Sequence, residues 1–121
     1  MSFQKGDYVR VTKLGSIDEP YHKTPSWDEY NEDKDSCNSI PTDYLAEGRL
    51  LIDFAIDGTL YMARERRNGV VRAGIFRTSY IKKIVEEGDF EMVFETMNSR
   101  YRVEKIIPPM AKQVGESNWN N

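Results

Sequence analysis

Two turn dipeptides, Asp57-Gly58 and Asn68-Gly69, constrain the fold of this chain more than any other feature of its sequence. An Asn or Asp followed by Gly supplies the two positive-φ positions of a type I′ turn, which joins neighbouring antiparallel strands. Apolar and polar residues alternate in Arg49–Ile56, before the first dipeptide, and β-forming residues follow both turns. The pattern therefore predicts a three-stranded antiparallel meander.

The two turns also predict which residues face each other across the meander. A two-residue loop fixes the register, because the residues that flank it must pair. The predicted pairs are Ile56–Thr59, Phe54–Tyr61, Ile52–Ala63, Arg67–Val70, Glu65–Arg72 and Met62–Ile75. The third strand ends in the segment Gly74–Ile84, where Thr78-Ser79 is expected to turn the chain into a closing strand anchored by Ile81 and Ile84.

Two further strand regions flank the meander in the sequence. Gly6–Thr12 alternates so that Val9 and Val11 share a face, which predicts a short first strand. After the meander, Phe90–Thr96 is predicted to pair with the residues that follow an Asn98-Ser99 turn, which forms a hairpin. That turn gives the pairs Phe94–Val103, Thr96–Tyr101 and Glu95–Arg102.

Periodicity is absent from residues 15–44, which hold Pro20, Pro25 and Pro41 among many polar and acidic residues. A loop of this length in a compact domain is either functional or disordered, and the sequence leaves both alternatives open. After Pro108-Pro109, residues 108–121 form a polar tail. We therefore expect one domain over residues 1–107, with an inserted loop at 15–44 and an added hairpin at 90–107.

Composition excludes several classes of protein. The chain has 121 residues, 31% of them charged, and a formal net charge of -3, which argues against a nucleic-acid-binding protein. Its single cysteine, Cys37, forms no internal disulfide, and no apolar run approaches the ~18 residues that span a bilayer. We expect a cytoplasmic protein with no membrane role.

No catalytic or metal-binding constellation is recognisable in the sequence. The single histidine, His22, lies in the proline-containing loop without a nearby carboxylate to orient it for nucleophilic catalysis. One His and one Cys do not complete a zinc site, and the loop carboxylates lack the spacing of a calcium loop. No phosphate-binding glycine motif is present. We expect a protein that is not an enzyme and needs no cofactor.

Arginines form the one local concentration of charge. Strand alternation predicts that Arg64, Arg66 and Arg77 share one face, where three guanidinium groups would bind phosphate oxygens. The alternative is a solvated face that protects a strand edge. The predicted nucleotide site comprises Arg64, Arg66, Arg77, Tyr80, Asn98 and Arg100. A homo-oligomer is expected in that case, because a single β-face encloses little of a ligand.

The acidic loop offers a second candidate surface, for a protein partner. Large aromatic residues flanked by carboxylates resemble an interface for a basic partner. The predicted protein-interaction residues are Trp27, Asp28, Glu29, Tyr30 and Asp33, with Tyr44 as a further aromatic of this surface. Equally, Trp27 could fold back and cover the domain.

The segment Gly74–Ile81 resembles the end of SH3 domains, and Gly6–Val11 resembles the first strand of SH3-like and KOW-type small barrels. The resemblance implies an SH3-like small barrel. Because it extends to KOW-type barrels, a nucleic-acid-associated module is a distant alternative. Arg77 stands where SH3 domains have proline and the meander contains no Trp, so only Tyr80 matches the family's peptide groove. The resemblance therefore implies the barrel without proline-rich peptide binding.

Two short segments resemble small accessory proteins of bacteriophages, in which Thr-Ser-x-Ile precedes a hairpin ending Thr-x-Asn-Ser-x-Tyr. Here they are Thr78–Ile81 and Thr96–Tyr101. The resemblance implies a counter-defence factor in the host cytoplasm that binds and blocks a host protein. The alternative that it implies is the sequestering of a small cyclic nucleotide.

Overall fold

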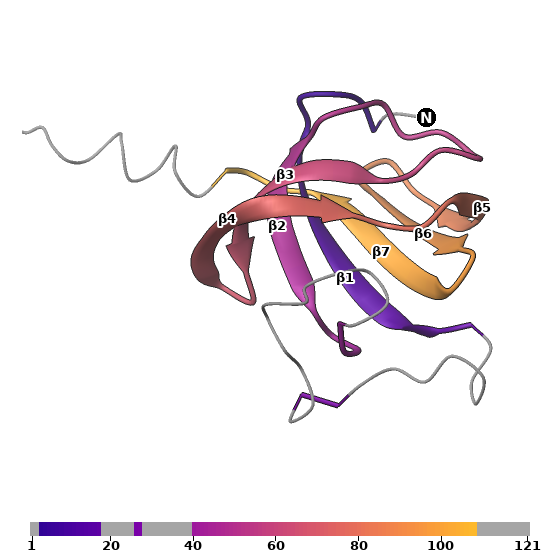
Figure 1. Cartoon of the computed structure of the whole chain (residues 1–121). Coiled ribbons are helices and arrows are strands. Elements are labelled where there is room, and N and C mark those ends of the chain that lie inside the picture. Colours follow the sequence, from indigo (N-terminus) through magenta and orange to yellow (C-terminus); the bar gives the residue numbers. More distant parts are fainter. Residues whose placement is uncertain (1–2, 18–25, 28–39, 109–121) are drawn as a thin grey trace, which may run out of the picture.

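The structure is a computed structural model and describes residues 3–17, 26–27 and 40–108. These residues form seven strands in one antiparallel sheet, ordered β4-β3-β2-β1-β7-β6-β5 (Figure 1). The strands are β1 (Tyr8–Ser16), β2 (Leu45–Leu50), β3 (Tyr61–Arg67), β4 (Val70–Arg77), β5 (Ile81–Glu87), β6 (Glu91–Thr96) and β7 (Ser99–Lys105). The prediction of a mainly β protein is confirmed. The described residues include no helix of the length and apolarity needed to cross a membrane.

The sheet is curled, although its two edge strands do not pair. β4 and β5 lie at opposite ends of the strand order, yet only Thr78–Tyr80 separate them in the chain. Four residue steps span at most about 14 Å, so the two edges approach each other where β4 ends. In Figure 1, β3 and β4 accordingly cross over β2, β1 and β7.

β1 lies at the centre of the sheet and pairs with both β2 and β7. Val9 and Val11 are almost completely buried, as the alternation of Gly6–Thr12 predicts. The strand is longer than predicted and continues to Ser16. The hairpin of β6 and β7 belongs to the same sheet, because β7 also pairs with β1.

A continuous row of aromatic rings fills the curl of the sheet. The successive ring pairs are Tyr44–Phe76 (5.9 Å), Phe76–Tyr101 (6.2 Å), Tyr101–Phe94 (5.6 Å) and Phe94–Phe54 (5.1 Å). Phe76 belongs to β4, Tyr101 to β7 and Phe94 to β6, so the ring contacts connect β4 with β7 and β6 across the core. Tyr44 is therefore a core residue, and its prediction as a surface aromatic is wrong.

The hairpin at Asn68-Gly69 has the predicted geometry. Asn68 and Gly69 have φ values of 53° and 83°, and Arg67 pairs with Val70. Asn tolerates this left-handed conformation and Gly adopts it without steric cost. The turn dipeptide therefore identified the β3–β4 connection correctly.

The predicted hairpin at Asp57-Gly58 is wrong. β2 covers Leu45–Leu50 rather than 49–56, and Leu50 pairs with Met62. After Leu50 the chain leaves the sheet, because its backbone groups bond elsewhere: the Phe54 N–H donates to the Phe3 carbonyl and the Asp57 N–H to the Ile81 carbonyl. The predicted pairs Ile56–Thr59, Phe54–Tyr61 and Ile52–Ala63 do not form.

Two register shifts change the predicted faces of β3 and β4. Glu65 is an extra residue of β3 relative to β2, because Gly48 pairs with Arg64 and Glu47 with Arg66. β4 in turn has an extra residue relative to β3 between Val71 and Gly74. The pairs Glu65–Arg72 and Met62–Ile75 are therefore not formed, and Met62 faces Phe76.

The β6–β7 hairpin differs from its predicted register by two residues. Phe94 pairs with Tyr101 and Glu95 with Arg100, so the turn residues are Met97 and Asn98. The predicted pairs Phe94–Val103, Thr96–Tyr101 and Glu95–Arg102 are wrong. A shift of two residues preserves the faces of a strand. Met92 and Phe94 are buried, whereas Phe90, which precedes β6, is 70% exposed.

Gly48 allows the close approach of β2 and β3 at the first register shift. A Cβ atom at this position would lie 2.0 Å from the carbonyl oxygen of Ala63. We expect Gly48→Ala to lower the free energy of unfolding by about 2 kcal/mol, because the backbone must shift. Urea denaturation measures this loss. Gly88→Ala is the matched control, since its Cβ would make an ordinary 3.5 Å contact, and equal losses in both variants would contradict the prediction.

Candidate functional site

Backbone hydrogen bonds bring four separate connections together at the end of the sheet where β4 leads into β5. The connections are the β2–β3 segment, the β4–β5 turn, the β6–β7 turn and the end of β1. The bonds run from the Asp57 N–H to the Ile81 carbonyl (2.8 Å), from the Met97 N–H to the Tyr80 carbonyl (3.0 Å) and from the Ile17 N–H to the Asn98 carbonyl (2.9 Å).

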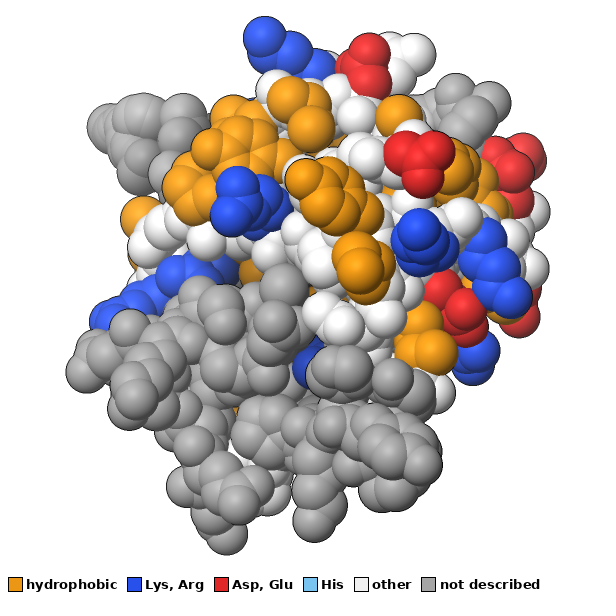
Figure 2. All heavy atoms as spheres, turned by 45° about the vertical axis from the view of Figure 1, so that its right-hand side comes forward, with side chains coloured by type: hydrophobic (Ala, Val, Ile, Leu, Met, Phe, Trp, Pro, Cys, Tyr) orange, Lys and Arg blue, Asp and Glu red, His pale blue; other side chains and the backbone are white. Residues whose placement is uncertain are grey.

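Each of these connections exposes a large apolar side chain at or next to its hydrogen-bonded residue, and the β2–β3 segment exposes Ile52 (41%) as well. The exposed fractions are 43% for Ile17, 45% for Ile56, 58% for Tyr80 and 57% for Met97. We call these four residues the four-loop surface. Figure 2 views the molecule from the side of β5 and β6 and shows hydrophobic side chains lying between charged ones. A contiguous group of exposed apolar side chains is typical of a contact surface.

A network of hydroxyl groups fixes the backbone beneath this surface. The Thr96 Oγ1 accepts hydrogen bonds from the backbone N–H groups of Asn98 (3.3 Å) and Ser99 (3.1 Å) and from the Ser79 hydroxyl (3.2 Å). The Asn98 side-chain amide donates to the Ser79 hydroxyl (3.4 Å). Both phage-like segments, Thr78–Ile81 and Thr96–Tyr101, meet in this network, where their polar side chains hold turns together.

Arg64 does not belong to a surface site. Its side chain lies on the core face and is 8% exposed. The guanidinium donates to the Tyr44 hydroxyl (2.7 Å), to the Arg72 carbonyl (3.0 Å) and to the Ala73 carbonyl (3.5 Å). Arg64 therefore positions the bulge of β4.

Arg66 lies on the opposite face of β3, because Glu65 is inserted between the two arginines. There the Arg66 Nε is 4.0 Å from Glu47, whose carboxylate also accepts a hydrogen bond from Arg10 (3.0 Å). Arg10 in turn lies 3.9 Å from Glu104. Arg66 is thus one member of a cross-strand row of alternating charges, which stabilises the outer face of the sheet.

Arg77 pairs with Tyr61 and is exposed on the outer face. The predicted shared face of all three arginines is therefore wrong, because the register shifts leave Arg66 and Arg77 on the outer face and Arg64 on the core face. Tyr80 and Asn98 lie together at the four-loop end. Arg100 is close to them along β7, where it forms an ion pair with Glu95 and lines a cavity of about 330 Å³ with residues 14–17.

Of the five predicted protein-interaction residues, Trp27 alone lies within the described part of the chain. Its side chain is 46% exposed. Asp28, Glu29, Tyr30 and Asp33 lie outside the described residues.

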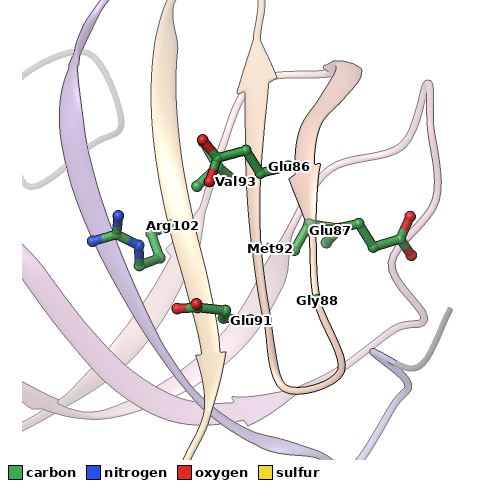
Figure 3. Close-up of a pocket in the computed structure, with 7 residues that line it drawn as sticks. All are labelled: Glu86, Glu87, Gly88, Glu91, Met92, Val93 and Arg102. Carbon is green, nitrogen blue, oxygen red and sulfur yellow. The ribbon is translucent and has the colours of Figure 1, made fainter.

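A second hollow, of about 160 Å³, lies beside the β5–β6 hairpin. Figure 3 shows that Glu86, Glu91 and Arg102 lie on one side of the strands, whereas Glu87 points to the other. The glutamates thus do not converge on one point. No group of three His, Cys, Asp or Glu side chains arranged to hold a metal ion occurs among the described residues.

Sequence reasoning missed most of the four-loop surface. Ile56 was assigned to a buried strand face, and Ile17 and Met97 were not identified. The segments Thr78–Ile81 and Thr96–Tyr101 were the one available signal, because they include Tyr80 and Met97.

No family model, curated protein or solved structure matches this chain.

Tyr8 provides a test of the outer-face electrostatics. Its hydroxyl donates to the Glu65 carboxylate (3.1 Å). Burial, together with the hydrogen bond and negative charge of Glu65, raises the pKa of Tyr8 from 10.0 to about 12. Between these values the unfolded state loses this proton and the folded state keeps it, so the contribution of Tyr8 to stability is lost as the pH rises.

We expect Glu65→Gln to lower the pKa of Tyr8, because the substitution removes the charge that disfavours tyrosinate. A pH titration by NMR of ring-labelled tyrosine measures this pKa. Glu86→Gln is the control, since that carboxylate does not contact Tyr8. An unchanged pKa in Glu65→Gln would contradict the assignment.

Thr96→Val tests whether the hydroxyl network holds the turn. The substitution keeps the side-chain shape but leaves the N–H groups of Asn98 and Ser99 without their acceptor. We expect a loss of about 2 kcal/mol in the free energy of unfolding, measured by urea denaturation. Thr12→Val, on the half-buried outer face of β1, should change it by less than about 0.5 kcal/mol. Equal effects would show that the network does not stabilise the turn.

Proposed function

We propose that this chain is a non-catalytic binding protein that docks another protein through the four-loop surface. The observation that carries the proposal is the hydrogen-bonded assembly of four connections, each of which exposes at least one large apolar side chain. Exposed apolar groups held on a fixed backbone lose little conformational entropy on binding, which favours affinity. Tyr and Met are moreover enriched in protein interfaces.

The resemblance to phage accessory proteins makes a host protein the expected partner, which docking would block. Two observations support this extension. Thr78–Ile81 and Thr96–Tyr101 build the turns that carry Tyr80 and Met97, so the similar segments coincide with the proposed contact surface. Tyr80, which corresponds to the SH3 groove tyrosine, is exposed and available for contact.

We also propose that the sheet is a variant of the SH3-like small barrel. The curl of the sheet and the three-residue connection between its edge strands support this relationship.

The nucleotide-sequestering alternative has less support. It needs arginines that converge, whereas Arg64 is engaged in the core and Arg66 pairs with Glu47. The other four residues of the predicted nucleotide site lie at or near the four-loop end of the molecule: Arg77, Tyr80, Asn98 and Arg100. A thermal-shift screen of cyclic and linear nucleotides would test this alternative. Short oligonucleotides added to the same screen would test the distant alternative, a nucleic-acid-associated module.

Site-specific photo-crosslinking tests the docking proposal. The crosslinking residue p-benzoylphenylalanine replaces one exposed aromatic at a time in the full chain, expressed in host cells. Tyr80 probes the four-loop surface, Trp27 the acidic loop, and Phe90, which is 70% exposed outside both, is the matched control. We expect a protein adduct from position 80 that is absent from position 90.

The three positions separate the possible outcomes. An adduct from position 27 alone would place the docking surface in the acidic loop and overturn the proposal. Equal adducts from positions 80 and 90 would indicate non-specific capture and would also count against it. Mass spectrometry of a specific adduct identifies the partner.

A further inference from the structure

The outer edge of β4 is the least protected strand edge of the molecule. Within the described residues, β4 pairs with β3 and has no second neighbour. Every residue of β4 except Phe76 is exposed, including Val70, Val71 and Ile75. The other edge strand, β5, carries Lys82, Lys83, Glu86 and Glu87, and such charges are the usual protection of a strand edge.

The charge of β4 is of one sign. The strand contains Arg72 and Arg77 and no acidic residue. Pairing two copies of β4 would place four arginines in two neighbouring strands that contain no acidic residue, and like charges on neighbouring strands are destabilising. The same charge attracts an extended segment that contains Asp or Glu.

The bulge limits where an added strand can pair. The carbonyl groups of Arg72 and Ala73 accept hydrogen bonds from the Arg64 side chain. Beyond the bulge, Gly74–Arg77 runs in regular register with β3. In this stretch Ile75 and Arg77 lie on the outer face, because they pair with Ala63 and Tyr61, while Phe76 points into the core.

We propose that the Gly74–Arg77 edge of β4 binds an extended acidic segment of another protein by β-strand addition. Alternate backbone groups of an edge strand point away from the sheet and supply the hydrogen bonds of such pairing. Ile75 and Arg77 are two residues apart on one face, so they select a partner with an apolar residue and an acidic residue at the same spacing. The inference does not depend on the four-loop surface, which uses side chains of other segments.

An NMR titration of the isotope-labelled full chain tests the inference. The probe is a short synthetic peptide that repeats the order valine–serine–glutamate–serine. We expect chemical-shift changes and slower amide exchange confined to Gly74–Arg77. The same peptide with every amide N-methylated keeps its side chains but has no N–H donor on either edge, and its methyl groups obstruct strand pairing, so we expect it not to bind.

Charge exchange provides the specificity test. Arg77→Glu should weaken binding of the glutamate peptide about tenfold and favour the counterpart that carries lysine. Lys82→Glu, an exposed charge reversal on the other edge strand, should leave both affinities unchanged.

Three results would overturn the inference. One is binding that maps to β5, and another is equal binding of the N-methylated peptide. The third is a dimer of the chain alone, joined through β4 and lost on dilution, because the occupant of the edge would then be a second copy.

Discussion

The aromatic row through the core is the interaction on which the rest of this structure depends. A seven-stranded sheet with only three residues between its edge strands must curl tightly, and the curl must be filled. The rings from Tyr44 to Phe54 fill it and connect β4 with β7 and β6. Phe76 is central, because it is the one buried residue of an otherwise exposed edge strand. Without this ring, β4 would be attached by its pairing with β3 alone.

The two register shifts in β3 and β4 decide which charges are available for binding. They direct Arg64 into the core and Arg66 into the ion pairs of the outer face, and they leave Arg77 exposed near the four-loop surface. Extra residues in a strand re-aim side chains in this way. Buried and paired arginines therefore stabilise the sheet, while the exposed apolar loops and the free edge remain for contacts.

The sequence predicted what local chemistry controls and missed what distant contacts control. The Asn68-Gly69 turn depends only on the positive φ angles that these two residues adopt easily, so its hairpin was predicted correctly. Asp57-Gly58 carries a similar local signal, but hydrogen bonds to β5 and to the N-terminal segment override it. Register shifts likewise depend on neighbouring strands, such as the approach of Ala63 to Gly48, and alternation within one strand does not reveal them. The arginine face was wrong for this reason, and the four-loop surface arises from contacts between segments far apart in the chain.

The central position of β1 has a consequence for how the chain acquires its structure. One neighbour, β2, is separated from β1 by residues 17–44 in the chain, whereas the other, β7, is the last strand of the described residues. During synthesis one edge of β1 stays unpaired until its partner β7 has been made. Pairing between such distant segments closes large loops and slows folding. The nascent chain is thus open to non-native association at β1 until β7 has been made.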